Sequence, residues 1–337
     1  MSAVPLLEAE GLVKHFPGRR GMADLLTGRP RPIVRALDGA SLVVHHKETV
    51  GIVGESGCGK STLARCLVKL HLPDAGVLRF EGVPLEMGDT SQMERFRRAV
   101  QMVFQDPYGS LNPRMTVGQA LAETLSVHRI VPSEHIATRV AELVARVGLP
   151  EDATFRRPWD FSGGQRQRIG IARALAVEPR VLIADEPVSA LDVSVQSQIV
   201  NLFLELQARL GLALVFITHD LRLVRHMTHR VAVMYLGRIV ETGPTAALFA
   251  APRHPYTQAL MRAMPRLHPG RRSGAAAVMG ELPGPLAPPP GCAFHPRCPV
   301  ADAKCSVEVP ELRGIVGSMV ACHRVGDTAE TIHRTPR

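Results

Sequence analysis

Apolar residues follow two patterns along the chain, one typical of buried strands and one typical of amphipathic helices. Residues 99–104, 181–184 and 213–218 are short, mostly apolar runs that end at polar residues, as buried parallel strands do. Helical periodicity extends over residues 116–128 and 133–147. The same spacing recurs further on at Ile199, Leu202, Phe203, Leu206 and Leu210. Strands that alternate with helices predict an α/β fold with a parallel core sheet.

The remaining segments predict antiparallel strands at the edges. Residues 5–53 are expected to form short strands interrupted at residues 17–35, where Gly, Arg and Pro indicate a surface loop. A helix is expected over residues 60–70. Residues 230–242 predict a hairpin that turns at Gly237.

Length and composition divide the chain into a large and a small part. The 337 residues suit one full-sized domain and an appendage, and 45% are hydrophobic, which is enough for a packed core. We expect a first domain at residues 1–265 and a second part at residues 266–337. The second part starts with a stiff linker containing Pro283, Pro285, Pro288, Pro289 and Pro290. A small module with four cysteines follows, and the linker suggests that it is a separate unit.

Charge and hydropathy bear on location and partners. The net charge of +9 is spread along the chain without a long block, so we interpret it as a solvated surface and expect no nucleic acid partner. The longest apolar runs, such as residues 212–217, fall far short of the ~18 residues that a membrane span needs. The N-terminus does not resemble a signal peptide. We therefore expect a cytoplasmic protein that reaches a membrane only by docking onto a partner.

A glycine-rich segment with the pattern G-x-x-x-x-G-K-[ST] follows an apolar run and precedes an expected helix. It comprises Gly54, Glu55, Ser56, Gly57, Cys58, Gly59, Lys60, Ser61 and Thr62. Backbone N–H groups of such a loop surround phosphate oxygens, and the helix N-terminus adds positive charge. Lys60 is expected to reach the β- and γ-phosphates of ATP, and the Ser61 hydroxyl to bind Mg²⁺. The alternative is a glycine-rich turn that arose by chance.

Two carboxylates follow the apolar run at residues 181–184. Asp185 at the tip of a strand is expected to hold Mg²⁺ beside the phosphate loop. Glu186 is then placed to act as the general base on the attacking water. Taken alone, this pair would indicate only an exposed acidic turn.

The segment FSGGQRQRIGIARAL closely resembles the signature motif of ATP-binding-cassette (ABC) ATPases. Ser162, Gly163, Gly164 and Gln165 match it, whereas Phe161 replaces the usual Leu. A plain helix N-cap would account for Ser162 alone. The resemblance implies a cassette with a helical signature subdomain, in which two cassettes pair head to tail and each signature faces the partner's ATP.

Further elements of that family occur in the same order. Gln105 resembles the glutamine that senses Mg²⁺ and contacts the membrane partner, and Asp192 ends a segment that resembles the D-loop. His219 resembles the histidine that contacts the γ-phosphate. Phe16 lies where the family places an aromatic ring on adenine. The resemblance covers about residues 5–265.

Three segments resemble the ATPases of oligopeptide and dipeptide importers, a group that includes nickel importers. They are QDPYGSLNPRMTVG, HPYTQAL and the tail GCAFHPRCPVADAKC. The resemblance implies a subunit at the cytoplasmic face of the membrane that powers import of short peptides. Its implied partners are two permease subunits, a related second ATPase or another copy of itself, and indirectly an extracytoplasmic binding protein. Tyr108 and Leu111 are expected to contact the permease.

Four cysteines lie close together near the C-terminus. Cys292, Cys298, Cys305 and Cys322 in a reducing compartment favour a metal site over disulfides. Their spacing lacks the C-x₂-C pairs of most structural zinc sites. Some relatives with this tail bind a 4Fe–4S cluster, so we rank the cluster first, zinc second and free thiols third.

Other functions remain as alternatives. One is the ATPase subunit of an importer of nickel or another small solute. The other is a soluble ABC ATPase that has no role in transport. The latter usually carries two cassettes or a long coiled-coil insertion, and the sequence shows neither feature. A P-loop kinase would lack the signature and D-loop segments, and an exporter subunit would lack this tail.

Overall fold

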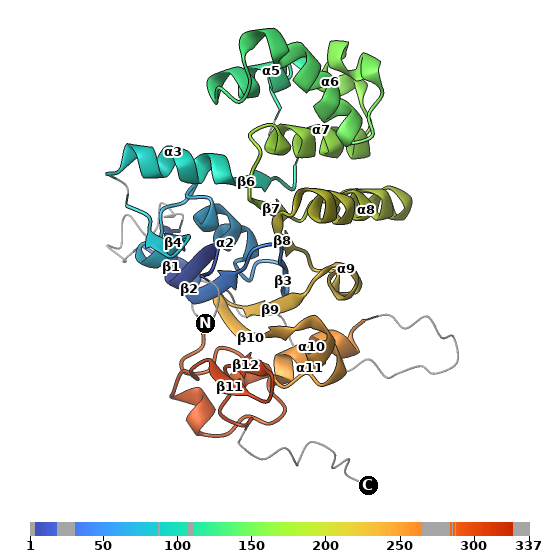
Figure 1. The fold of residues 1–337 in the computed structure, drawn as a ribbon. Helices are drawn as coiled ribbons and strands as arrows, with labels where there is room; N and C mark the ends of the chain where they lie inside the picture. Colours follow the sequence, from blue (N-terminus) through green and yellow to red (C-terminus); the bar gives the residue numbers. More distant parts are fainter. Residues whose placement is uncertain are drawn as a thin grey trace, which may run out of the picture.

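A mixed eight-stranded sheet forms the centre of the molecule (Figure 1). This computed structural model describes residues 4–18, 31–86, 88–106, 109, 111–264, 284, 286 and 288–325. The strand order is β11-β12-β10-β9-β3-β8-β7-β6. These strands are β3 (Thr49–Val53), β6 (Val100–Val103), β7 (Val181–Asp185), β8 (Ala213–Ile217), β9 (Arg230–Tyr235), β10 (Arg238–Pro244), β11 (Arg313–Ile315) and β12 (Ser318–Val320).

The centre of the sheet is parallel, as the apolar runs predict. Strands β3, β7 and β8 are buried along their whole length, and β6, β7, β8, β3 and β9 pair in parallel. Parallel strands with both faces covered by other elements carry apolar residues throughout, which explains these sequences. The hairpin expected at residues 230–242 is confirmed as β9 and β10, which turn at Gly237.

A second, four-stranded antiparallel sheet has the order β2-β1-β4-β5. Its strands are β1 (Leu7–Pro17), β2 (Ile33–Val44), β4 (Ala75–Phe80) and β5 (Val83–Pro84). The loop expected at residues 17–35 is shorter than predicted, because β1 continues to Pro17 and pairs there with Ile33. Its middle, residues 19–30, lies outside the described residues.

Nine α-helices are found in the described part of the chain, and none of them is long and apolar enough to cross a membrane. They are α2 (Lys60–Leu67), α3 (Thr90–Ala99), α5 (Val117–Val127), α6 (Ile136–Arg146), α7 (Gly163–Leu175), α8 (Val193–Leu210), α9 (Leu221–Met227), α10 (Thr245–Ala250) and α11 (Pro255–Arg262). The predicted helix at residues 133–147 is divided into a 3₁₀ turn (Ser133–His135) and α6. Helices α5, α6 and α7 gather at one end of the molecule (Figure 1).

Three apolar clusters hold these layers together. One joins the antiparallel sheet, α2 and α3 to one face of the large sheet. A second joins α5 to α8 to β6, β7 and β8. The third lies around β9 and β10 and includes Phe294 of the C-terminal tail. The α/β class with a parallel core, antiparallel edges and a helical subdomain is therefore confirmed.

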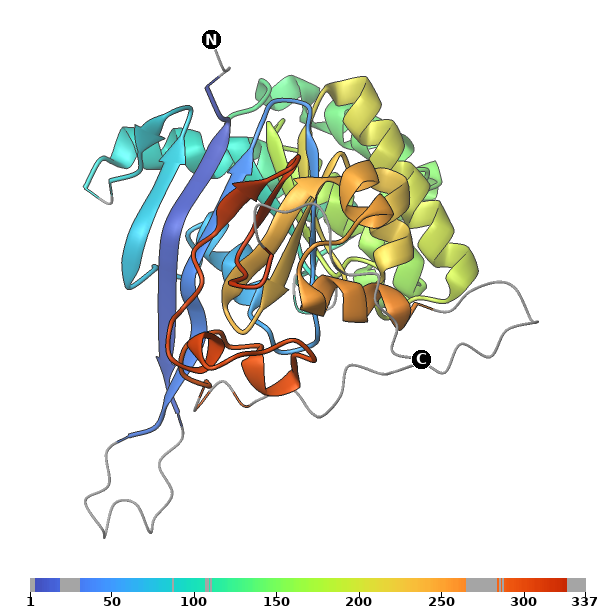
Figure 2. The ribbon, with the colours of Figure 1, turned by 90° about the horizontal axis from the view of Figure 1, so that it is seen from below.

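The tail, residues 288–325, packs against the large sheet and extends it. Strand β12 pairs with β10 at Glu241↔Val320, and Figure 2 shows the tail strands beside the hairpin. The Phe294 ring is buried edge-on against Tyr235, at 5.3 Å between centroids. Contrary to the expectation from the linker, the tail is packed onto the cassette. The expected boundary at residues 265 and 266 lies outside the described residues.

Candidate nucleotide-binding site

The glycine-rich segment forms the turn between β3 and α2. Gly59 precedes the helix with φ +106°, and a Cβ atom there would overlap the carbonyl oxygen of Ala36. Only glycine fits this left-handed, close-packed position without strain. The turn therefore leads directly into the N-terminus of α2, the arrangement that suits phosphate binding.

The ammonium group of Lys60 is buried inside this turn. Nζ donates to the carbonyl oxygens of Gly54 and Glu55, both at 2.9 Å, and lies 4.0 Å from Oε1 of Glu186. Cys58 is buried beside it, and burial raises the pKa of that thiol despite the neighbouring Lys60 charge. Lys60 is thus positioned at the floor of the turn, where a polyanionic ligand would find a buried positive charge.

Ser61 and Asp185 meet although they are 124 residues apart. The Ser61 hydroxyl donates to Oδ1 of Asp185 at 2.9 Å. Burial raises the pKa of Asp185, the Ser61 hydrogen bond lowers it and the nearby Glu186 charge raises it, and the net direction is upward. A desolvated carboxylate next to a hydroxyl is a suitable donor set for Mg²⁺, which takes oxygen ligands.

Glu186 connects this pair to His219. Its Oε2 lies 3.5 Å from Nδ1 of His219, whose side chain is 60% exposed. Glu186 has φ +44°, a sparsely populated conformation for a residue other than glycine. The backbone N–H of Glu186 donates to the carbonyl of Ile217 at 3.0 Å, which holds it at the end of β8. The structure thus brings Lys60, Ser61, Asp185, Glu186 and His219 together at one edge of the sheet.

The signature segment begins helix α7. Ser162 caps this helix by accepting from the N–H of Gln165, while Gln165 Oε1 accepts from the N–H of Ser162. A Cβ atom on Gly164 would overlap the side chain of Val195 near the start of α8. Ser162 therefore caps α7, and Gly164 allows a close contact with Val195. None of the described contacts joins Ser162 to residues 54–62.

Gln105 and Asp192 are two further residues that the sequence predicts to belong to the site. Gln105 is exposed, and its side chain donates to Ser189 Oγ at 3.4 Å rather than to Ser61 or Asp185. Asp192 caps α8 by accepting from the N–H of Val195 at 2.9 Å. Ser189 in turn donates to the backbone carbonyl of Glu186 at 3.1 Å, so Gln105 is linked through Ser189 to the main chain of Glu186.

Phe16 lies near the end of β1. Its ring packs edge-on against His71 with 5.3 Å between centroids, and the Lys14 ammonium lies 5.5 Å from the ring centre. The ring is partly exposed, and its stacking on adenine stays a prediction.

Sequence reasoning assigned no role to two residues that contact the phosphate loop. The N–H of Glu55 donates to the hydroxyl of Tyr256, and the Glu55 carboxylate is paired with Arg297 in the tail. Both partners lie in segments recognised only as family resemblances, HPYTQAL and GCAFHPRC. They are 201 and 242 residues from Glu55, so no local spacing could have revealed these contacts.

The four tail cysteines share one neighbourhood. Burial raises the pKa of Cys292 to about 11, the N–H of Phe294 lowers it, and the charges of Cys322, Cys305 and Cys298 raise it further. The backbone N–H of Cys292 also donates to the carbonyl of Cys305 at 2.8 Å. Among the described residues, no group of three or more His, Cys, Asp or Glu side chains is arranged to hold a metal ion.

Comparisons with known families agree with this geometry. Residues 37–189 match the ABC transporter family, and residues 240–305 match the oligopeptide/dipeptide transporter C-terminal region. The chain is 49% identical to the dipeptide transport ATP-binding protein DppF of Escherichia coli, over 95% of each chain. It is also 49% identical to the probable peptide ABC transporter ATP-binding protein y4tS of Sinorhizobium fredii, over 98% of this chain and 93% of that one.

Solved structures show the same architecture. The dimeric cassette MJ0796 bound to ADP and Pi superposes with a TM-score of 0.61 at 27% identity, covering 71% of this chain and 98% of that one. The cbiO1 protein of Clostridium perfringens gives 0.61 at 30% identity, covering 73% and 91%. The fold and site define an ATP-hydrolysing cassette. The chain belongs to the family of ABC transporter ATP-binding proteins and carries the oligopeptide/dipeptide transporter C-terminal region.

Proposed function

We propose that this chain hydrolyses ATP at the Lys60–Glu186 site to power the import of short peptides through a membrane permease. The observation that carries the ATP assignment is the convergence of Lys60, Ser61, Asp185 and Glu186 at the N-terminus of α2. The peptide assignment is supported by the names of the relatives, which are dipeptide and peptide transport proteins.

Each residue of the site has a distinct proposed role. Lys60 exchanges its carbonyl partners for β- and γ-phosphate oxygens, and the backbone of residues 54–62 surrounds the phosphates. Ser61, Asp185 and Gln105 hold Mg²⁺, which neutralises charge on the phosphates when bound. Glu186 takes a proton from the attacking water, and His219 contacts the γ-phosphate. Phe16 stacks on the adenine ring.

A complete site is proposed to need two cassettes. Ser162, Gly163, Gly164 and Gln165 at the start of α7 would act on ATP held by a partner subunit, and Asp192 would lie at the same interface. The N-terminus of α7 offers N–H groups to an anion. The partner is a second, related ATPase or another copy of this chain, and the solved dimer of a similar cassette supports this arrangement.

Docking onto the permease is proposed to involve exposed aromatic residues of the helical subdomain. Phe155 is 82% exposed and Trp159 lies four residues later, also exposed. Exposed aromatic side chains of this size are typical of protein interfaces. Leu111, by contrast, is buried in the helical core and is not a surface contact. Tyr108 lies outside the described residues.

Docking is tested in the assembled transporter with Phe155→Ser. We expect nucleotide binding to be kept and peptide-stimulated hydrolysis to fall, because the contact that transmits the signal is lost. Val83→Ser, which removes an exposed apolar residue at the edge of the antiparallel sheet, is the control. Normal stimulation in the Phe155 variant would contradict the assignment.

Peptide import itself is tested in vesicles that contain the whole transporter. Uptake of labelled di- and tripeptides should require internal ATP and stop in a Lys60→Ala variant. ATP-dependent uptake of nickel with no peptide uptake would favour the alternative importer. ATP hydrolysis without association with any membrane subunit would favour a soluble ABC ATPase.

The four cysteines are proposed to hold one metal centre, a 4Fe–4S cluster before zinc. Thiolates are ligands that both centres accept, and the other three cysteines are near enough to Cys292 for their charges to raise its pKa. Because burial and the neighbouring thiols raise the pKa of Cys292, a metal has to displace protons, and affinity should rise with pH. The side chains must also turn to ligate, since the described arrangement is not that of metal ligands. The role is structural, because the ATP chemistry is complete without it.

This assignment is tested by anaerobic purification followed by iron, sulfide and zinc analysis with a visible absorption spectrum. Iron and sulfide in equal amounts support the cluster, whereas stoichiometric zinc without iron supports the second choice. A folded protein with four titratable thiols and neither metal contradicts both.

A further inference from the structure

We propose that Arg297 of the tail is a positioning residue for the ATP site and acts by holding the Glu55 carboxylate away from bound phosphates. The tail would then contribute directly to nucleotide affinity. This inference rests on the assignment of residues 54–62 as the phosphate loop, which the proposed function already makes.

The two residues form a two-pronged ion pair. Nη1 of Arg297 donates to Oε2 of Glu55 at 2.9 Å, and Nη2 donates to Oε1 at 3.1 Å. The Arg297 side chain is 6% exposed and that of Glu55 is 23% exposed, so water screens the pair only in part. Pairs with this geometry and burial are stronger and more directional than exposed surface pairs.

Glu55 is also held through its backbone. Its N–H donates to the Tyr256 hydroxyl at 2.9 Å, and its carbonyl accepts from Nζ of Lys60 at 2.9 Å. Glu55 therefore contacts Lys60 through its backbone carbonyl and Arg297 through its carboxylate. A shift of Glu55 would therefore shift Lys60.

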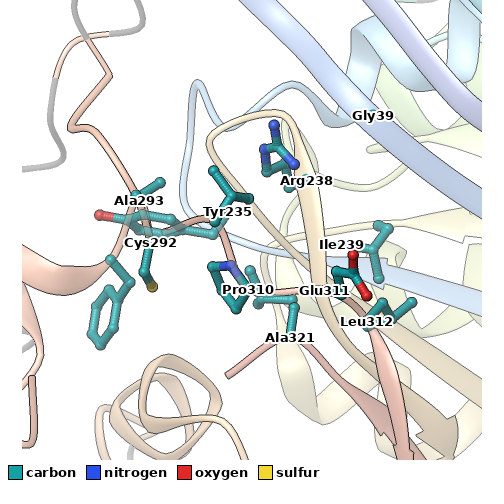
Figure 3. A pocket seen from close by; sticks show the side chains of 14 residues that line it. Gly39, Tyr235, Arg238, Ile239, Cys292, Ala293, Pro310, Glu311, Leu312 and Ala321 are labelled. Atoms are coloured by element: carbon teal, nitrogen blue, oxygen red, sulfur yellow. The ribbon is translucent and has the colours of Figure 1, made fainter. Parts of the chain in front are cut away.

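Contacts of the tail fix the position of Arg297. The residue ends a 3₁₀ turn (His295–Arg297) that follows the buried ring of Phe294. Its Nη1 also lies 3.4 Å from the Tyr235 hydroxyl. Figure 3 shows Cys292 and Ala293 of the tail beside Tyr235 of the hairpin, at a cavity of about 430 Å³ between the two segments. The Arg297 guanidinium, carried by the tail, therefore contacts Tyr235 of β9 as well as Glu55.

Charge gives this contact a role in ligand binding. Glu55 is the one carboxylate within residues 54–62, the segment proposed to surround the phosphates of ATP. An unpaired carboxylate there would repel a polyanion at short range. Arg297 cancels that charge by pairing with the carboxylate. Removing the arginine should therefore weaken ATP binding, and removing the Glu55 charge as well should restore it.

The test measures the MgATP dissociation constant of the full-length chain by calorimetry. Arg297→Gln is expected to weaken binding about tenfold, the equivalent of one partly buried charged contact. The double variant Arg297→Gln with Glu55→Gln should recover most of that loss. Arg324→Gln removes another tail arginine, paired with Asp302 at 3.3 Å, and serves as the matched control. Thermal unfolding of each variant reports on folding separately.

Four outcomes would overturn the proposal. Unchanged affinity in Arg297→Gln, alongside lost binding in Lys60→Ala, defeats the role of Arg297 while leaving the phosphate loop in place. Weakened binding that the Glu55 substitution fails to restore shows that Arg297 only supports the fold of the tail. Normal ATP binding by Lys60→Ala removes the phosphate-loop assignment itself. Should Arg297→Gln unfold, Glu55→Gln alone leaves the Arg297 charge uncompensated beside the loop and should strengthen MgATP binding, so unchanged or weakened binding there defeats the proposal.

Discussion

Nδ1 of His219 lies 3.5 Å from Oε2 of Glu186, at the ends of two neighbouring parallel strands. The carboxyl ends of β7 and β8 lie at the same edge of the sheet, so residues 33 positions apart in the chain meet there. Open α/β sheets place ligand sites at this edge. The pair defines where the attacking water and the γ-phosphate are expected.

Glu186→Gln should keep ATP binding and lose turnover. Loss of a general base typically reduces the rate by about 10²–10⁴-fold, whereas the proposed phosphate contacts of Lys60 would be unchanged. The variant should also accumulate an ATP-bound dimer. Hydrolysis and nucleotide affinity are measured together in the assembled complex, with Glu205→Gln, an exposed partner of Arg209 on α8, as the control. Near-normal hydrolysis would remove Glu186 from its role.

Ser162→Arg should leave ATP binding by the isolated subunit nearly intact and abolish hydrolysis by the complex, because Ser162 is proposed to act on the partner's ATP. The substitution also removes a helix cap, at a cost of about 1 kcal/mol. Thr116→Arg matches that cost, since Thr116 caps α5 through an equivalent capping box with Gln119. Hydrolysis in the Thr116 variant isolates the contribution of the signature. Loss of ATP binding in the Ser162 monomer would show that Ser162 belongs to its own site.

His254→Asn should flatten the stability of the chain between pH 6.5 and 4. Complete burial lowers the pKa of His254 from 6.5 to about 4. The neutral imidazole accepts from the N–H of Tyr256 at 3.0 Å, and protonation would end that bond. Stability from this group is therefore full above pH 6.5 and is lost as the pH falls towards 4, by on the order of 3 kcal/mol.

The measurement is the free energy of unfolding by denaturant against pH. Burial raises the pKa of Glu241, so the contribution of Glu241 to stability grows as the pH falls, opposite to that of His254. The difference between the wild-type and variant curves isolates the contribution of the histidine. Asn keeps the capping acceptor but does not titrate. His226→Gln, at an exposed position on α9, is the control. Parallel curves for wild type and His254→Asn would refute the prediction.

Phe294→Ala should destabilise the packing of the tail against the cassette by about 3–5 kcal/mol, the usual cost of deleting a buried phenylalanine ring. The ring contacts both Tyr235 and Tyr256. Hydrogen exchange should show faster opening of β12 and β10, and Val307→Ala, at an exposed tail position, should leave both unchanged. Unaltered exchange in the Phe294 variant would mean that the tail is held by other contacts.

Local patterns in the sequence determined most of the cassette. Residues 54–62 predict a phosphate-binding turn because glycine spacing and the following helix are local properties, and the apolar runs predict β7 and β8 for the same reason. The signature segment was identifiable from its resemblance to a family motif, and Glu186 only in combination with the phosphate loop upstream. The family resemblance supplied the order in which these elements occur.

Tertiary structure alone decided how the tail meets the ATP site. The sequence indicated a separate unit after a proline-rich linker, yet β12 pairs with β10 and Arg297 reaches Glu55 across 242 residues. Strand pairing and buried ion pairs between distant segments depend on which surfaces the completed fold brings together, and no spacing along the chain encodes that. Leu111 is a second example, since the family resemblance led us to expect a contact with the permease, whereas the packing of the helical subdomain buries the side chain.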